Sequence, residues 1–382
     1  MRRLAMAVAV LCLGALTWGA NPSVPAPPNW QIEVVDGGSR NNVGLYPTLV
    51  VDQKDNLHVV YGQGVMGAGA TLAYAYRPKT GGKWFTMKLG SGGPTSSLAV
   101  NSNGNPCVAY LFDGLRYAEF DGKKWSSQLI DPSNLAFFLS LQLDKDNHPR
   151  ISYYHRLYPD GSYALRLKYA FFDGKTWYTQ TVDPRLGMGK FNELALDSEG
   201  NPHIAYSDVE GFNLQYAHWN GENWVFGTPD TSKLSSGWVG TGTSITVDKS
   251  GSPYISYFEV NRRKLKVAHK VGEQWQREEV DTLVGNADRI ELTSIKLDSH
   301  GIPHIAYYDG GLGALKYATK TDSGWQTEIV DDSGDAGMYP SLAFTKEDVP
   351  YIAYYDSTNG MVKVAHLSKA TALPAAESAQ QR

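Results

Sequence analysis

Apolar and polar positions alternate along most of the chain in short runs, which are separated by Gly, Asn, Asp and Pro. Two of these runs are almost identical: residues 201–206 read NPHIAY, and residues 302–307 read IPHIAY. Alternation with many β-branched and aromatic side chains is typical of β-strands, and the residues between the runs are typical of turns. The pattern therefore predicts an all-β protein built from short strands.

Four kinds of run recur in a fixed order: S-L-x-x-D, P-x-I-x-Y, L-x-Y-A and W-x-x-E-x-V-D. The second kind occurs seven times and ends at Tyr61, Tyr110, Tyr153, Tyr206, Tyr257, Tyr307 and Tyr354. The Trp residues that open the fourth kind are 41 to 52 residues apart, at Trp84, Trp125, Trp177, Trp224, Trp275 and Trp325. Repeats of this length with four strands each predict a β-propeller.

The seventh repeat lacks its fourth run, and the missing run stands at the other end of the chain. Trp30 opens WQIEVVD, which matches WQTEIVD from Trp325. An N-terminal strand that completes the last unit can close a ring of repeats. We therefore predict a seven-bladed β-propeller of four-stranded antiparallel blades over residues 30–368, in which the N-terminal strand closes the last blade.

The turn between the first two strands of each unit has its own pattern. Its first residue is able to accept a backbone N–H within the turn, and is Asp52, Asn101, Asp144, Asp197, Asp248, Asp298 or Thr345. Three positions later stands Gly, Asn or Asp, the residues that best tolerate a left-handed backbone. We expect tight turns capped by the first side chain.

His203 and His304 recur because their strand recurs, and the same column also holds His58, Cys107 and Arg150. A metal site would not accept that mixture, so we predict no metal ligands here. Cys107 lies within a strand pattern, and we expect a buried, unreactive thiol.

The two ends of the chain differ from the repeats. Arg2 and Arg3 precede an apolar run over residues 4–16, which suits a secretory signal and is shorter than a membrane span. We predict a signal peptide over residues 1–20, a Pro-rich linker over 21–29 and a disordered tail over 369–382. An uncleaved anchor is the alternative. The mature protein would be secreted or periplasmic, without a transmembrane segment.

Composition and motifs exclude several functions. The chain has 35 Lys and Arg against 39 Asp and Glu, a net charge of −4, without the basic stripe that a nucleic acid requires. It contains no H-E-x-x-H, G-x-S-x-G or Walker A motif, and GQGVMG at residues 62–67 opens no expected helix. We expect neither nucleic acid nor a cofactor.

Propellers usually bind ligands on the face formed by the connections between strands two and three and between blades. The second strands deliver polar residues to this face at Asp113, His155, Asp208, Glu259, Asp309 and Asp356. The fourth strands deliver acids at Asp36, Asp131, Asp183, Asp281 and Asp331. Carboxylates beside Tyr residues could bind sugar hydroxyls or a cation, or they could simply cap turns.

Departures from the repeat indicate further candidates. Trp238 lies in the long connection into the fifth unit, where it could be a ligand platform or pack over the loop. The third unit inserts residues 155–166, which add Tyr158 to the candidate ligand residues. If a catalytic site exists there, His155 would be its base and Asp160 would orient it, and both are weak candidates.

The region from Trp30 to about Leu367 resembles secreted bacterial seven-bladed propellers of the fucose-lectin-like and sialidase-like superfamilies, in architecture and in the texture of its repeats. The S-x-D-x-G-x-T-W box of sialidases is missing, and the D-x-x-G-x-P turn, as in DSEGNP from Asp197, has a different spacing. The resemblance implies an exported, non-catalytic module that binds carbohydrate through the loop face. The alternatives are a scaffold for cell-surface or extracellular proteins and a glycan-cleaving hydrolase or lyase.

Overall fold

The computed structural model describes residues 30–37, 43–65, 68–93, 95–132, 136–157, 164–232, 237–284 and 292–368. The predicted signal peptide, linker and C-terminal tail lie outside these ranges. Within them no helix is long and apolar enough to cross a lipid bilayer.

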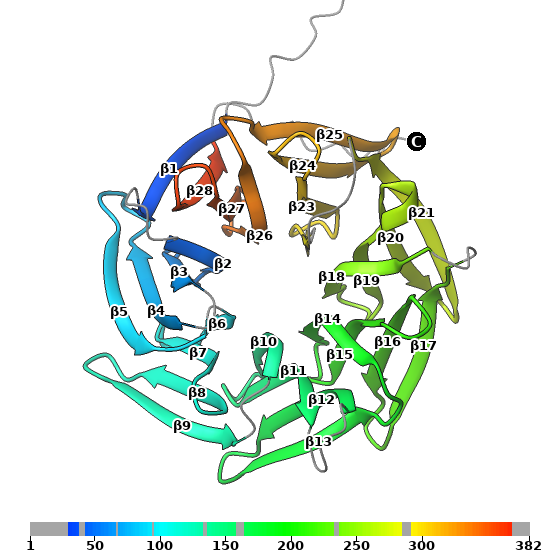
Figure 1. The fold of residues 1–382 in the computed structure, drawn as a ribbon, viewed down its shortest axis with the longest axis horizontal. Coiled ribbons are helices and arrows are strands. Elements are labelled where there is room, and N and C mark those ends of the chain that lie inside the picture. The colour runs from blue at the N-terminus through cyan, green and yellow to red at the C-terminus, as the bar shows by residue number, and fades with distance from the viewer. Residues whose placement is uncertain are drawn as a thin grey trace, which may run out of the picture.

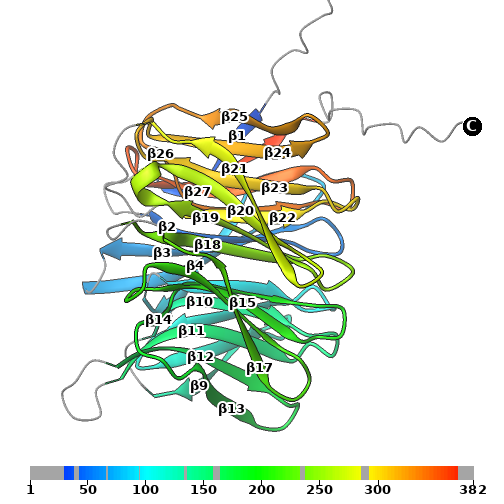
Figure 2. The ribbon, with the colours of Figure 1, turned by 90° about the vertical axis from the view of Figure 1, so that its right-hand side faces the viewer.

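Seven four-stranded antiparallel sheets form a closed ring, seen along its axis in Figure 1 and from the side in Figure 2. The innermost strands are β2 (Val43–Val51), β6 (Ser96–Val100), β10 (Ala136–Leu143), β14 (Met188–Leu196), β18 (Val239–Val247), β22 (Thr293–Leu297) and β26 (Ala336–Phe344). The second strands are β3 (Leu57–Val65), β7 (Pro106–Leu111), β11 (Pro149–Leu157), β15 (Pro202–Asp208), β19 (Pro253–Glu259), β23 (Pro303–Asp309) and β27 (Pro350–Asp356). The prediction of an all-β, seven-bladed β-propeller is confirmed.

The third strands are β4 (Ala68–Arg77), β8 (Leu115–Phe120), β12 (Ala164–Phe172), β16 (Asn213–Trp219), β20 (Lys264–Val271), β24 (Ala314–Thr321) and β28 (Met361–Leu367). The outermost strands are β5 (Phe85–Ser91), β9 (Trp125–Asp131), β13 (Trp177–Asp183), β17 (Trp224–Asp230), β21 (Gln274–Thr282), β25 (Gly324–Asp331) and β1 (Trp30–Gly37). A short 3-10 helix, Val260–Arg262, follows β19. We number the blades from one, β2 to β5, to seven, β26 to β28 with β1.

The N-terminal strand closes the ring as predicted. In blade seven β1 pairs antiparallel with β28, so that Trp30 lies opposite Leu367 and Gly37 lies opposite Met361. The first and last strands of the described chain thus share one sheet (Figure 1), and the outer edge of β28 is covered.

The predicted turns between first and second strands are present. In blade one, Asp52 Oδ1 accepts the backbone N–H of Lys54 at 2.7 Å and that of Asn56 at 2.8 Å. The third position after the first residue has a left-handed backbone in every blade, with φ between 56° and 87° at Asp55, Gly104, Asn147, Gly200, Gly251, Gly301 and Asp348. The recurrence of these residues therefore follows from turn geometry.

Neighbouring blades are joined by a tyrosine and an acid. In six blades, the buried Tyr that ends P-x-I-x-Y donates its hydroxyl hydrogen bond to the acid that ends the outer strand of the preceding blade. The distances are 2.6–2.8 Å, and the pairs are Tyr61–Asp36, Tyr153–Asp131, Tyr206–Asp183, Tyr257–Asp230, Tyr307–Asp281 and Tyr354–Asp331. The predicted fourth-strand acids are thus all engaged in holding blades together.

The innermost strands are joined by side chains as well. The Oγ of Ser341 accepts the backbone N–H of Leu49 at 3.0 Å, and the Oγ of Ser140 accepts that of Leu194 at 3.0 Å. Ser97, Ser244 and Ser294 make the same bond to the following blade. These contacts explain why Ser recurs in the first strand of the repeat.

Candidate functional site between blades one and two

Six of the seven blade interfaces are built alike, and the interface between blades one and two differs. Each interface contains one cluster of buried apolar side chains. Among the described residues the cluster between blades one and two has five buried members, and every other cluster has at least eight. This interface therefore has the smallest packed core of the ring.

The tyrosine-to-acid bond is also absent from this interface. The Tyr110 hydroxyl pairs with Ser127 Oγ of its own blade at 2.7 Å. Its usual partner would come from the end of β5, and Gly90 stands there instead of an acid, opposite Leu72 in the sheet. Blades one and two are consequently joined by fewer polar contacts than their neighbours.

A cavity of about 370 Å³ lies at this interface. It opens near the turns between first and second strands, since it is lined by residues 103–106 and by Asp52, Lys54, Asn56 and His58. Its apolar walls are formed by Tyr76, Phe85, Met87, Phe120 and Trp125. The volume falls within the roughly 300–1,000 Å³ that is usual for small-molecule sites.

Met87, which lines the cavity, differs from the polar residue that most blades carry at its position. Met87 of blade one and Gln128 of blade two take equivalent positions. Met87 lies opposite Tyr74 on the neighbouring strand, as Gln128 lies opposite Tyr117. Gln128 Oε1 accepts the indole N–H of Trp177 from the next blade at 3.1 Å. Met87 offers no such acceptor, and Trp125 Nε1 is buried without a hydrogen-bond partner.

A hydrogen-bonded chain of Tyr74, His58 and Asp52 forms the polar part of the lining. His58 Nδ1 lies 2.7 Å from the Tyr74 hydroxyl, and His58 Nε2 lies 3.3 Å from Asp52 Oδ2. Burial holds the pKa of His58 below its usual value, against the opposing effect of Asp52. Burial alone would raise the pKa of Asp52, but hydrogen bonds from Asn56, Lys54 and His58 keep it below its usual value.

The same hydrogen-bonded arrangement of Tyr, His and Asp recurs away from the cavity. His203 Nδ1 lies 2.6 Å from the Tyr216 hydroxyl, and His304 Nδ1 lies 2.7 Å from that of Tyr317. Each second imidazole nitrogen faces the first Asp of its turn, at 3.6 and 3.4 Å. The histidine column therefore braces the third strand against the turn, and the chain at His58 is a structural element exposed at the cavity rather than a catalytic group.

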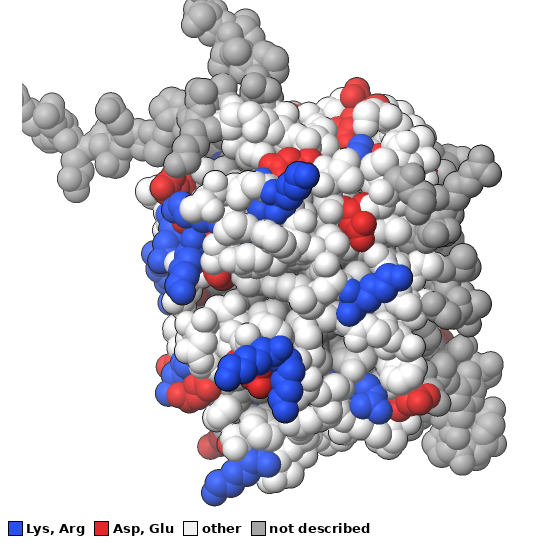
Figure 3. Space-filling model, turned by 90° about the vertical axis from the view of Figure 1, so that its left-hand side faces the viewer, with Lys and Arg blue, Asp and Glu red and all other residues white. Residues whose placement is uncertain are grey.

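The cavity suits a ligand with apolar faces and polar edges. Phe85 is 66% exposed and Met87 is 46% exposed, so apolar surface faces solvent at its mouth. The carboxamides of Asn103 and Asn105, the Lys54 ammonium and Asp52 supply donors and acceptors around it. Figure 3 shows the side of the molecule that carries the outer strands of blades one and seven, where basic and acidic side chains are scattered over a largely uncharged surface. Aromatic walls with convergent polar groups are typical of a binding site for neutral polar molecules.

The acids predicted at the ends of second strands have structural partners. Asp208 accepts the backbone N–H of Glu210 and Gly211 at 2.9 and 2.8 Å, and Asp356 accepts that of Asn359 at 3.0 Å. Further contacts are Asp309 with the backbone N–H groups of Val284 and Gly311, Asp356 with Lys363, and Glu259 with Lys266 and Arg262. These are the contacts of turn caps and ion pairs, and a role of these acids in ligand binding stays a prediction.

The remaining predicted residues are spread around the ring. Asp113 is exposed at the end of the second strand of blade two, and His155 is buried at the Tyr153 ring in blade three. Trp238 precedes β18 in blade five. Tyr158 and Asp160 lie outside the described residues. The structure does not bring the described candidates together, and none of them lines the cavity between blades one and two.

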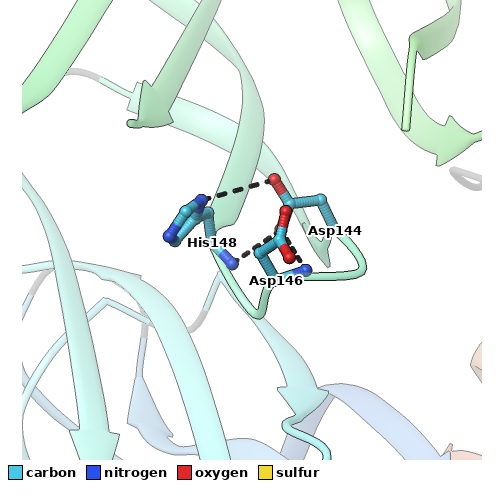
Figure 4. Close-up of side chains that lie close together, drawn as sticks. All are labelled: Asp144, Asp146 and His148. Carbon is cyan, nitrogen blue, oxygen red and sulfur yellow. Dashed lines mark hydrogen bonds and ion pairs between the residues drawn. The ribbon is translucent and has the colours of Figure 1, made fainter. Parts of the chain in front are cut away.

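Asp144, Asp146 and His148 form one group whose ligand atoms lie within 4.8 Å of one another (Figure 4). All three belong to the turn between β10 and β11. Asp144 Oδ1 accepts the N–H groups of Asp146 and His148 at 2.9 and 2.8 Å, and its Oδ2 accepts Arg150 Nη2 at 2.6 Å. Because turn geometry explains the grouping and the guanidinium repels a cation, we assign no metal site to it.

Cys107 is fully buried, as predicted. Burial raises the pKa of its thiol to about 12, so the thiol is protonated at neutral pH and unreactive.

We expect a Met87→Gln variant to be more stable than the wild type by about 1 kcal/mol, because glutamine can accept the orphaned Trp125 indole N–H. Urea unfolding of both proteins measures this difference. Met87→Leu is the matched control, since leucine offers no acceptor. Equal stabilities of the Gln and Leu variants would contradict the assignment of Met87 as the missing partner.

Comparison with known proteins shows the fold. No protein-family model matches the chain, and no curated protein matches its sequence. A protein of unknown function from Dyadobacter fermentans has a similar structure, with a TM-score of 0.55, 12% identity, and coverage of 90% of this chain and 100% of that one. YCF48 bound to D1 peptide gives a TM-score of 0.54, 17% identity, and coverage of 93% and 100%. The SapL1 lectin in complex with alpha methyl fucoside gives 0.52, 14%, and coverage of 75% and 97%.

Proposed function

We propose that this protein is a non-catalytic carbohydrate-binding propeller, and that the cavity between blades one and two is a ligand site. The observation that supports this most is the aromatic cavity at the one interface where the repeated joining contacts are missing. At the other six interfaces the tyrosine hydroxyl binds the acid of the preceding blade. A departure from the repeat that opens an aromatic pocket is not explained by the architecture.

The chemistry of the walls favours a sugar. Pyranose rings present C–H faces that stack on aromatic side chains, and their hydroxyls both donate and accept hydrogen bonds. Phe85, Phe120 and Trp125 supply the faces, and Asn103 and Asn105 supply amide groups at the edge. The similar fold of a lectin that binds a fucoside is consistent with a sugar site in such a ring, although at 14% identity it supports the fold alone.

The predicted loop-face site remains a separate proposal. We still propose Asp113 and Trp238 as ligand-binding residues of this face, since neither side chain forms a turn cap or an ion pair among the described contacts. We also retain the proposal of export, which rests on the apolar run over residues 4–16.

A glycan array with the protein tests the function, and titration calorimetry with the strongest ligand tests the site. We expect Phe85→Ala to weaken binding about tenfold, which corresponds to the roughly 1.4 kcal/mol that a stacked aromatic can contribute. Phe226→Ala is the matched control, because Phe226 is also an exposed phenylalanine of an outer strand, 45% exposed, but lies in blade four. An array without any binding contradicts the function, and equal losses in both variants contradict the site.

A further inference from the structure

A second aromatic group lies between blades four and five, well separated along the ring from the cavity described above. Phe191 belongs to β14, Phe212 to the connection between β15 and β16, and Trp238 directly precedes β18. The Trp238 ring lies 6.3 Å from that of Phe191 and 5.6 Å from that of Phe212. We call Lys190, Phe191, Phe212 and Trp238 the Lys190 cluster.

Lys190 is the only charged residue of this cluster. Its Nζ lies 4.8 Å from the centre of the Phe191 ring and 4.7 Å from that of Trp238, within the range of a cation–π contact. The side chain is half-buried, and burial lowers the pKa of its ammonium group. No carboxylate lies within ion-pair distance of Lys190 among the contacts of the described chain.

Four lysines of the third strands, by contrast with Lys190 of β14, are all paired. Lys168, Lys266, Lys316 and Lys363 each bind the acid that ends an outer strand. A lysine held over two aromatic rings without an acid is therefore an exception in this protein. Because desolvating a charge costs free energy, a half-buried cation without a counter-ion is prepared to bind an anion.

The two phenylalanines stand at backbone positions that favour glycine. Phe191 has a φ of 55°, and Phe212 has a φ of 56°. In the register of the repeat, Phe191 shares its position with Tyr46, Phe138 and Tyr339, which also have a positive φ, whereas Gly313 takes the position of Phe212 in blade six, with φ 66°. The architecture therefore does not require an aromatic ring at the position of Phe212, and a bulky residue there carries a backbone strain that glycine avoids.

From these observations we propose that the Lys190 cluster is a second ligand site, which binds a carboxylate-bearing pyranose, that is, a hexuronate unit of an acidic oligosaccharide. The carboxylate would pair with the Lys190 ammonium, and the ring faces would stack on Trp238 and Phe212. The class of ligand rests on the proposed carbohydrate-binding function, but the site and its residues are independent of the cavity between blades one and two. Phe212 is 39% exposed, so its ring is accessible.

Calorimetric titration with oligomers of galacturonate, glucuronate and mannuronate tests this proposal. The same oligomers with methyl-esterified carboxylates are the matched neutral ligands. We expect at least one uronate to bind the wild type, an at least tenfold loss of its affinity in Lys190→Met, and equally weak binding of its methyl ester to both proteins. The wild-type affinity should fall with added salt, as the pairing of two opposite charges requires.

Phe212→Gly separates ligand binding from folding. Glycine is the unstrained residue at this φ, so we expect an unchanged urea midpoint together with weaker uronate binding. Failure of all three uronates to bind, or equal affinities of wild type and Lys190→Met, would overturn the proposal. Neutral glycans that still bind, and still depend on Phe85, would show in that case that the proposed function holds while the second site does not.

Discussion

An Asp331→Ala variant should unfold with a free energy about 3 kcal/mol lower than that of the wild type, the lower end of the cost of breaking a buried charged pair. Asp331 is 3% exposed and accepts the Tyr354 hydroxyl at 2.6 Å and Lys363 Nζ at 3.3 Å. Without the carboxylate, the Tyr354 hydroxyl is left buried without its acceptor. Lys363 keeps Asp356 at 2.6 Å, which is why we expect the lower end of the range.

Two further variants show which part of the contact matters. Asp331→Asn retains an acceptor and loses the charge, so its loss should be smaller than that of Asp331→Ala. Tyr110→Phe removes the corresponding hydroxyl in blade two, where the partner is the exposed Ser127, and should change stability by less than about 0.5 kcal/mol. Urea unfolding measures all three. An Asp331→Ala protein as stable as Tyr110→Phe would show that the bonds between tyrosine and acid do not hold the blades together.

Acid should destabilise the protein in two steps, of which the first lies between about pH 6.5 and 4. Burial lowers the pKa of seven imidazoles, those of His58, His155, His203, His218, His269, His304 and His366. In the unfolded chain these groups take up protons below about pH 6.5, while in the folded protein they stay neutral to lower pH. The unfolded state therefore binds more protons in this range, and the free energy of unfolding falls as the pH is lowered.

His203 sets the scale of this effect, since its pKa is lowered to about 4. A shift of this size corresponds to about 3 kcal/mol between neutral pH and pH 4 for this residue alone. The second step follows below about pH 4, where Asp183 and Asp331 must be protonated although hydrogen bonds hold their pKa values below the usual one.

Urea unfolding at pH 7.5, 6, 5 and 4 measures the first step. His203→Gln, which cannot titrate, is the control and should reduce the dependence on pH in this interval, whatever its own effect on stability at pH 7.5. Unfolding free energies that are equal at pH 7.5 and pH 5 would contradict the description of these histidines as buried and neutral.

The fold could be predicted because each repeat carries its own geometry. The first residue of each turn, the left-handed third position and the Tyr at the end of the second strand all fulfil local requirements, so their spacing is visible in the sequence. The match between the runs that begin at Trp30 and at Trp325 likewise predicted the closure, because each run forms the outer strand of its own blade. The acid of blade four, Asp230, was missed because TPD replaces the usual V-D of its run.

The candidate site could not be predicted from such columns, because it depends on contacts between neighbouring units. The sequence shows the acids of the outer strands but not that each one binds a tyrosine of the following blade. Two signals could have drawn attention to blades one and two. Their Trp residues, Trp84 and Trp125, have the shortest spacing, 41 residues, and Met87 and Gly90 replace polar residues that most other units carry. Only the structure shows that these departures meet at one cavity.

A crystal structure of the protein soaked with the neutral oligosaccharide that binds best on the array tests the central proposal most directly. We predict sugar density between blades one and two, with a pyranose ring against Phe85 or Trp125 and hydroxyls within hydrogen-bond distance of Asn103 or Asn105. Density at another interface or on the opposite face, with this cavity unchanged, would contradict the assignment of the site.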